Sequence, residues 1–229
     1  MPDLPYLLSR HRGWRVTIIL LGMLLLSACS ALSVAADTPR SAADTATVRL
    51  EMRTELGPIL IEIYPDKAPL SAGNFLRHVE AGSYDKGSFY RTVRIDNDRN
   101  PATIQVVQGG LGRPDLPNPP PSPFSPIAHE STASTGLHHD DGALSLARGA
   151  PGTASSEFFI SVGANPALDS GGTRNPDGLG FAVFGRVIEG MALVRRIHQL
   201  SANAAVGDEY VRGQMLDVPV QIESIRRVE

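Results

Sequence analysis

Hydrophobic and polar residues alternate between residues 47 and 64. Apolar side chains occupy every second position of Thr47–Thr54, and three isoleucines do the same in Pro58–Tyr64. Only Glu55-Leu56-Gly57 separates the two segments. A period of two places the apolar residues on one face of a strand, and a short connection containing glycine is typical of a hairpin. We therefore predict a β-hairpin.

The spacing of apolar residues then changes from two to that of a helix. In Pro69–Gly82, Ala72, Phe75, Leu76 and Val79 fall at positions i, i+3, i+4 and i+7. A proline at the first position and a glycine at the last match the usual start and end of a helix. A second helix is predicted over Met191–Leu200.

Short apolar runs predict the remaining strands. They are Ser88–Arg94, Thr103–Val107, Gly142–Arg148, Phe158–Val162, Phe181–Val187 and Val218–Val228. Many short strands with two separated helices indicate a mainly β domain. The pattern alone leaves a closed barrel and a sandwich open. His78 and His198 lie on or near the predicted helices, and we expect them at the surface or at helix ends.

The N-terminus has the features of an export signal. Arg10, Arg12 and Arg15 precede Val16–Leu26, which is apolar and uncharged. This segment is too short for a transmembrane helix, which needs about 20 residues, but it suits the hydrophobic region of a signal peptide.

Cys29 follows directly, in Leu26-Ser27-Ala28-Cys29, and is the only cysteine of the chain. This motif is similar to the lipidation site of bacterial lipoproteins. We predict a signal peptide over 1–28, a flexible tether over 29–46 and a folded domain over 47–229. The domain would then be lipid-anchored on the periplasmic side of a bacterial membrane. The alternative is cleavage near Ala36, which would release a soluble periplasmic protein.

The amino-acid composition limits which classes of partner this domain can bind. The chain has 229 residues, with 21 basic and 24 acidic ones. Without the predicted signal peptide, 18 basic and 23 acidic residues remain, and Lys67 and Lys86 are the only lysines. The absence of a basic cluster from this sequence argues against nucleic acid as a partner. About 180 residues suffice for one domain with a substantial core.

Five short motifs carry the strongest functional signal. They are, in order, Phe89-Tyr90-Arg91, Val107–Gly110, Leu144–Arg148, Ser156–Ser161 and Val183–Met191. In this order and spacing, residues 47–228 resemble the cyclophilin family of peptidyl-prolyl cis-trans isomerases. The resemblance implies a closed eight-stranded antiparallel barrel capped by two α-helices. It also implies a monomer that acts on proline-containing polypeptides with no cofactor and no metal.

The resemblance assigns Arg91 as the catalytic residue and Gln108 as a second catalytic residue that contacts the substrate and holds the arginine. An arginine stays charged and offers several N–H donors in rigid geometry. The resemblance also places substrate-binding residues around a proline pocket: Ala147, Phe159, Leu168, Phe181, Val106 and Gln105.

Several positions depart from the family. Gln105 and Val106 stand where the family has Phe and Met, Ala167 where many members have Trp, and Phe181 where many have His. The connection between Arg91 and Gln108 is longer than in the family and contains Asp96–Pro101. A second insertion, Ser170–Leu179, is predicted to be a loop beside the site.

Two functions follow. The first is a prolyl isomerase that assists the folding of exported proteins. The alternative is a catalytically weak module that binds proline-containing peptides, which the substitutions in the pocket favour. His138-His139-Asp140-Asp141 is interpreted as a solvated turn rather than a metal site.

Overall fold

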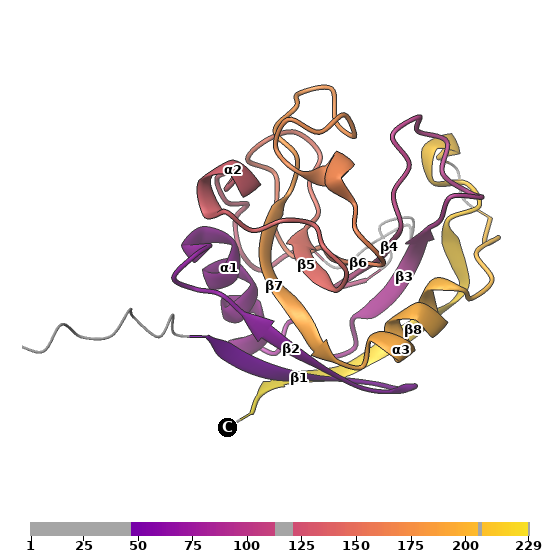
Figure 1. Ribbon diagram of the computed structural model, residues 1–229. Helices are drawn as coiled ribbons and strands as arrows, with labels where there is room; N and C mark the ends of the chain where they lie inside the picture. The colour runs from indigo at the N-terminus through magenta and orange to yellow at the C-terminus, as the bar shows by residue number, and fades with distance from the viewer. Residues whose placement is uncertain (1–46, 113–120, 206–207, 229) are drawn as a thin grey trace, which may run out of the picture. The chain divides into compact units, whose positions relative to one another are not determined.

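The computed structural model describes residues 47–112, 121–205 and 208–228. Its strands are β1 (Val48–Thr54), β2 (Gly57–Ile63), β3 (Ser88–Val93), β4 (Val106–Gly110), β5 (Ala143–Leu146), β6 (Phe158–Ser161), β7 (Ala182–Glu189) and β8 (Met215–Arg227). They form one closed barrel in the order β1-β2-β7-β5-β6-β4-β3-β8 (Figure 1). All neighbouring strands are antiparallel. The expected eight-stranded barrel is confirmed. The predicted signal peptide, Cys29 and the tether lie outside the described residues.

The N-terminal hairpin has the predicted alternation. β1 pairs with β2 so that Leu50 faces Ile61 and Met52 faces Ile59. All four side chains are fully buried. The charged residues between them in β1 point away from this core, because successive side chains of a strand point to opposite faces.

The two predicted helices are present as α1 (Pro69–Glu80) and α3 (Met191–His198). α1 buries Phe75 and Leu76, and α3 buries Val194 and Ile197. Figure 1 shows the two helices beside different strands of the barrel. Within the described residues, no helix is sufficiently long and apolar to span a membrane.

Three short helical segments were not predicted. They are α2 (Thr132–Thr135) and the 3₁₀ helices η1 (Pro166–Leu168) and η2 (Glu209–Val211). Each is too short to show a helical period of apolar residues. α2 is instead stabilised by the Ser131 hydroxyl, which accepts a hydrogen bond from the Ser134 N–H.

The prediction of a strand over Thr103–Val107 was wrong by three residues, since β4 begins at Val106. The Asn165 side chain hydrogen-bonds to both backbone groups of Gln105. It accepts from the Gln105 N–H at 2.7 Å and donates to the Gln105 carbonyl at 3.1 Å. These bonds come from a residue 60 positions away. No local pattern signals them.

The last strand begins earlier than predicted, at Met215 instead of Val218. It pairs with β3 through Met215 opposite Arg91 and then through Val220 opposite Phe89, with an irregularity between the two pairs. Pro219 lies within this irregular stretch, where a residue without an N–H is tolerated.

The buried apolar residues form two clusters. The larger one fills the barrel and includes Phe75, Phe158 and Phe184. The smaller one consists of Val93, Ile104, Val106, Phe159 and Leu168. Phe158 and Phe159 therefore belong to different clusters, as the alternation of a strand predicts. The smaller cluster is the base of the candidate site.

His78 and His198 lie in the last turns of α1 and α3, at helix ends as expected, but both are buried rather than at the surface. The side chain of His78 is fully buried. Its ring packs against Tyr84 and Phe124, and neither ring nitrogen hydrogen-bonds to another described residue. Burial lowers the pKa of His78 from 6.5 to about 4, and the neighbouring Arg77 acts in the same direction.

Candidate active site

Arg91 lies on β3 and its guanidinium is held by two amide side chains. Nη1 donates to Gln108 Oε1 at 3.0 Å. Nε and Nη2 both donate to Gln214 Oε1, at 3.0 and 2.6 Å. The Tyr210 ring lies 5.5 Å from the guanidinium carbon. None of these partners is a carboxylate, so the charge of Arg91 is oriented without being neutralised.

Gln108 is in turn fixed by its neighbours. β3 and β4 pair so that Arg91 is opposite Gln108, and Gln108 Nε2 donates to the Tyr90 hydroxyl at 2.9 Å. Tyr90 donates to the Glu157 carboxylate. Because the Gln108 amide nitrogen is occupied, its oxygen faces Arg91.

The Glu157 carboxylate anchors this chain of hydrogen bonds. It accepts from the Leu111 N–H at 3.2 Å and from the Ser156 hydroxyl at 3.3 Å. Burial raises the pKa of Glu157, whereas its hydrogen bonds act in the opposite direction. Burial and the neighbouring Glu157 raise the pKa of Tyr90 well above its ordinary value. Tyr90 therefore remains a neutral donor.

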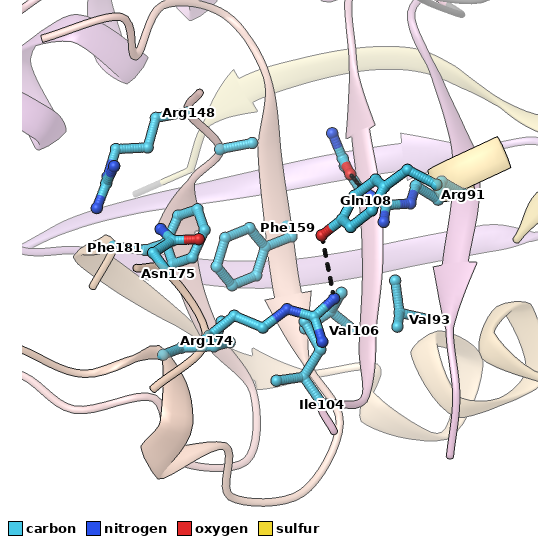
Figure 2. A pocket seen from close by; sticks show the side chains of 13 residues that line it. Arg91, Val93, Ile104, Val106, Gln108, Arg148, Phe159, Arg174, Asn175 and Phe181 are labelled. Atoms are coloured by element: carbon cyan, nitrogen blue, oxygen red, sulfur yellow. Dashed lines mark hydrogen bonds between the residues drawn. The ribbon is translucent and has the colours of Figure 1, made fainter. Parts of the chain in front are cut away.

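A cavity of about 140 Å³ opens next to Arg91. Its lining combines Arg91, Gln108, Arg148, Arg174, Asn175 and Tyr210 with the apolar residues Val93, Ile104, Val106, Ala147, Phe159, Leu168 and Phe181. Figure 2 shows Arg91 and Gln108 on one side of this pocket and Phe181 and Arg148 on the other.

Phe159 provides the aromatic surface of the pocket together with Phe181. The two rings meet edge to face, with centroids 5.4 Å apart, which is a favourable arrangement for aromatic pairs. The Arg148 guanidinium lies over the Phe181 ring at 5.2 Å. It is fixed there by Asp177 and by the Gly180 carbonyl.

His139 supports Phe159 from behind, so its interpretation as part of a solvated turn was wrong. Its ring stacks on Phe159 at 5.8 Å and is almost fully buried. Nδ1 lies 2.7 Å from Asp169 Oδ1, and Nε2 lies 3.1 Å from Ser145 Oγ. Burial lowers the pKa of His139, and the hydrogen bond to Asp169 opposes this shift. Among the described residues, no group of three or more His, Cys, Asp or Glu side chains is placed to hold a metal ion.

Most of the predicted site residues share this one cavity: Arg91, Gln108, Ala147, Phe159, Leu168, Phe181 and Val106. Gln105 is the exception and does not line it. Its neighbour Ile104 does, because the backbone alternates and Asn165 fixes Gln105 before the strand begins. Ile104 therefore supplies the apolar side chain next to the position where the family has Phe.

The sequence did not identify three polar residues of the site, namely Gln214, Tyr210 and Arg174. Gln214 is almost fully buried and lies directly before β8. Arg174 belongs to the second insertion and pairs with Asp98 of the first at 2.6 Å, both side chains being buried. Its Nη2 also donates to the Tyr210 hydroxyl at 3.4 Å. A pair of opposite charges in two insertions was the only available signal.

The geometry suits binding of a small apolar ring next to a fixed positive donor. The pocket offers neutral amides and charged guanidinium groups, which can bind a polar group of a ligand and polarise it. An apolar floor with one oriented donor at its edge is the arrangement expected for a site that stabilises a change in charge distribution.

Comparisons with known proteins identify the family. The sequence model of the cyclophilin-type peptidyl-prolyl cis-trans isomerases matches residues 49–226. A peptidyl-prolyl cis-trans isomerase of Streptomyces antibioticus is 34% identical over 178 residues, which cover 77% of this chain and 96% of the relative. One from Acinetobacter baylyi is 33% identical over 213 residues, covering 92% and 96%.

A solved structure supports the fold. It is that of a cyclophilin-type isomerase of Cryptosporidium parvum, determined in the presence of the dipeptide Ala-Pro. It matches with a TM-score of 0.58 and 19% identity, covering 79% of this chain and 99% of that one. The chain thus belongs to the cyclophilin family and is a peptidyl-prolyl cis-trans isomerase.

Proposed function

We propose that Arg91 is the catalytic residue of this isomerase and that its clients are exported proteins that are unfolded or partly folded. One observation carries the catalytic part. The Arg91 guanidinium is held from two sides by Gln108 and Gln214, at the edge of a cavity whose floor is Phe159.

The proposed mechanism follows from the chemistry of the prolyl amide. Its rotation barrier of about 18–20 kcal/mol arises because the nitrogen lone pair is delocalised into the carbonyl. When the bond twists, the lone pair becomes localised and can accept a hydrogen bond. A fixed guanidinium N–H from Arg91 then stabilises the twisted state more than either planar state, which is the condition for catalysis. Burial lowers the pKa of Arg91, but an arginine side chain stays charged in proteins.

The surrounding residues would hold the peptide. Phe159, Leu168 and Phe181 would receive the proline ring, with Val106 and Ile104 beside them. The Ala147 N–H donates to the Glu157 carbonyl at 2.8 Å. We infer that the Ala147 carbonyl pairs with the backbone of the substrate.

The alternative is a module that binds proline-containing peptides with little turnover. Ala167 supports it, because a small residue stands where many family members have Trp. Two observations oppose it. Phe159 and Phe181 together supply an aromatic surface, and Arg91 lines the same cavity as both.

The first test substitutes Arg91 in the full chain and measures how fast each protein isomerises a short Xaa-Pro peptide. We expect Arg91→Ala to lower kcat/KM by about 100- to 1000-fold, the usual loss when one oriented donor is removed. Arg91→Lys keeps the charge but not the two-sided hydrogen bonding, so we expect it to recover only a small part. Activity of Arg91→Ala close to that of the unaltered protein would refute the role of Arg91. Absence of turnover in the unaltered protein would favour the binding module.

We further propose that the chain is exported and anchored through Cys29. The basic N-terminal residues, the apolar segment Val16–Leu26 and the cysteine that follows it support this proposal. Two or more acyl chains give stable anchoring, whereas one binds only marginally. Residues 30–46 are rich in Ala, Ser, Thr and Asp, a composition suited to a tether.

The second test follows the full-length chain in bacterial cells fed a labelled fatty acid. We expect label on the unaltered chain and its recovery with membranes. Cys29→Ser should be unlabelled and should appear in the periplasmic fraction or remain unprocessed. Ser33→Ala, which lies outside the motif Leu26–Cys29, serves as the control that preserves the cysteine. A soluble, unlabelled chain cleaved near Ala36 would instead support the alternative.

A further inference from the structure

The insertion between β3 and β4 is fastened to the segment that precedes β8. The Asn97 side chain makes the attachment through three hydrogen bonds. It accepts from the Arg94 N–H at 2.7 Å, and it donates to the carbonyls of Thr92 at 3.2 Å and Gly213 at 2.9 Å. These bonds fix the backbone of Asn97 beside Gln214, the residue that follows Gly213.

The Asn97 carbonyl then accepts a hydrogen bond from Gln214 Nε2 at 3.0 Å. An amide side chain has one donating and one accepting end. With the donating end held by Asn97, the oxygen of Gln214 must face Arg91, where it accepts from both Nε and Nη2. If the amide turned over, its NH₂ group would meet the guanidinium donors and both bonds to Arg91 would be lost.

We propose that Asn97 is a positioning residue for Arg91, acting through Gln214. The inference rests on the proposed catalytic role of Arg91 and gives the first insertion a function in the reaction. Stabilising the twisted amide depends on the direction of one N–H, and such geometry tolerates little displacement. Gln108 holds the other side of the guanidinium, so loss of the Asn97 contact would loosen Arg91 without releasing it.

The next residue supports a role of this insertion at the site. Asp98 pairs with Arg174, which also lines the cavity. Its second carboxylate oxygen accepts from the Asn100 N–H at 3.1 Å, so the same turn that presents the Asn97 carbonyl is stabilised from within. Two consecutive residues of the insertion thus act on the two arginines beside the pocket. Asn97 contacts Gln214, which holds Arg91, and Asp98 pairs directly with Arg174.

The test compares Asn97→Ala with Asp96→Ala in the full chain. Asp96 lies in the same insertion, its side chain is 73% exposed and it pairs only with Arg94 among the described residues. We expect Asn97→Ala to lower kcat by 10- to 100-fold while the KM for an Xaa-Pro peptide stays within threefold. Asp96→Ala should change neither. A rise in KM that accounts for the loss, or equal activity of the two variants, would overturn the proposal.

A double substitution separates positioning from a general loss of structure. On the background of Arg91→Ala, residual isomerisation measured by NMR exchange should not fall further when Asn97→Ala is added. An additional tenfold loss would mean that Asn97 acts independently of Arg91. Should Asn97→Ala fail to fold, Asn97→Asp keeps the shape and the acceptor but loses both donors, and the same outcomes apply.

The two proposals fail in different ways. If Arg91→Ala retains activity, the catalytic role of Arg91 is wrong whatever Asn97 does. If Arg91→Ala loses activity and Asn97→Ala does not, the catalytic role stands and only the positioning role is wrong.

Discussion

At the scale of single residues, the site depends on which face of a strand each side chain occupies. Phe158 and Phe159 are neighbours in β6, yet one packs in the barrel against Phe75 and Tyr84, and the other forms the pocket floor. The same alternation places Ile104 in the pocket and Gln105 outside it. A substitution on the pocket face of β6 therefore alters binding, whereas one on its barrel face alters stability alone.

Phe159→Leu and Phe158→Leu test this separation. Phe159→Leu removes the edge-to-face contact with Phe181, and such contacts contribute about 0.5–1.5 kcal/mol beyond buried area. Because this contact lies within the protein, its loss should lower the free energy of unfolding by a similar amount. Because Phe159 also lines the pocket, we expect KM to rise by about 5- to 10-fold. Phe158→Leu should lower the free energy of unfolding by about 1 kcal/mol and leave KM unchanged. Equal effects of both on KM would contradict the assignment of Phe159 to the pocket floor.

At the scale of elements, two insertions meet beside the site: the second contributes Arg174 and Asn175 to the lining of the cavity, and the first contacts Arg174. The predicted loops Asp96–Pro101 and Ser170–Leu179 are joined by the ion pair of Asp98 and Arg174, whose side chains are only 1% and 3% exposed. Removing one partner of such a pair leaves a buried charge unpaired, which is strongly unfavourable. The sequence identified both segments as insertions, but not that they meet, because 76 positions separate the two residues.

The strands show the same limit. Alternation predicted the hairpin correctly, because its partners are adjacent in sequence and their apolar faces are complete. It misplaced the start of β4 and of β8, where side chains from distant segments, or an irregular register around Pro219, decide which backbone groups pair.

At the scale of the whole molecule, closure of the barrel brings α1 against the core and buries His78. The unfolded chain can protonate this histidine near its ordinary pKa of 6.5, whereas in the folded protein the pKa is about 4. Between these values the unfolded state binds more protons. The stability that the neutral, buried His78 contributes is therefore complete above pH 6.5 and is lost as the pH falls toward 4.

Chemical denaturation of the unaltered protein and of His78→Leu at pH 7.5 and pH 4.5 tests this. We expect the variant to gain about 2 kcal/mol relative to the unaltered protein on going to the lower pH. Comparing the two proteins cancels the titration of groups that they share. Parallel losses of stability would show that His78 does not titrate as described, and an NMR titration of its ring protons would give its pKa directly.

By itself, the sequence determined the kind of fold and most of the pocket. Local alternation marks the strands. The order of the short motifs indicates the enzyme family, and the resemblance to that family assigns Arg91, Gln108 and Phe159 to the site. Only the tertiary structure showed that Gln214 holds Arg91 from the side opposite Gln108. Gln214 lies 123 positions from Arg91 and 117 from Asn97, and neither contact leaves a periodic signal. Periodicity reports which face of an element is buried, whereas hydrogen bonds between distant polar side chains exist only once the barrel has closed.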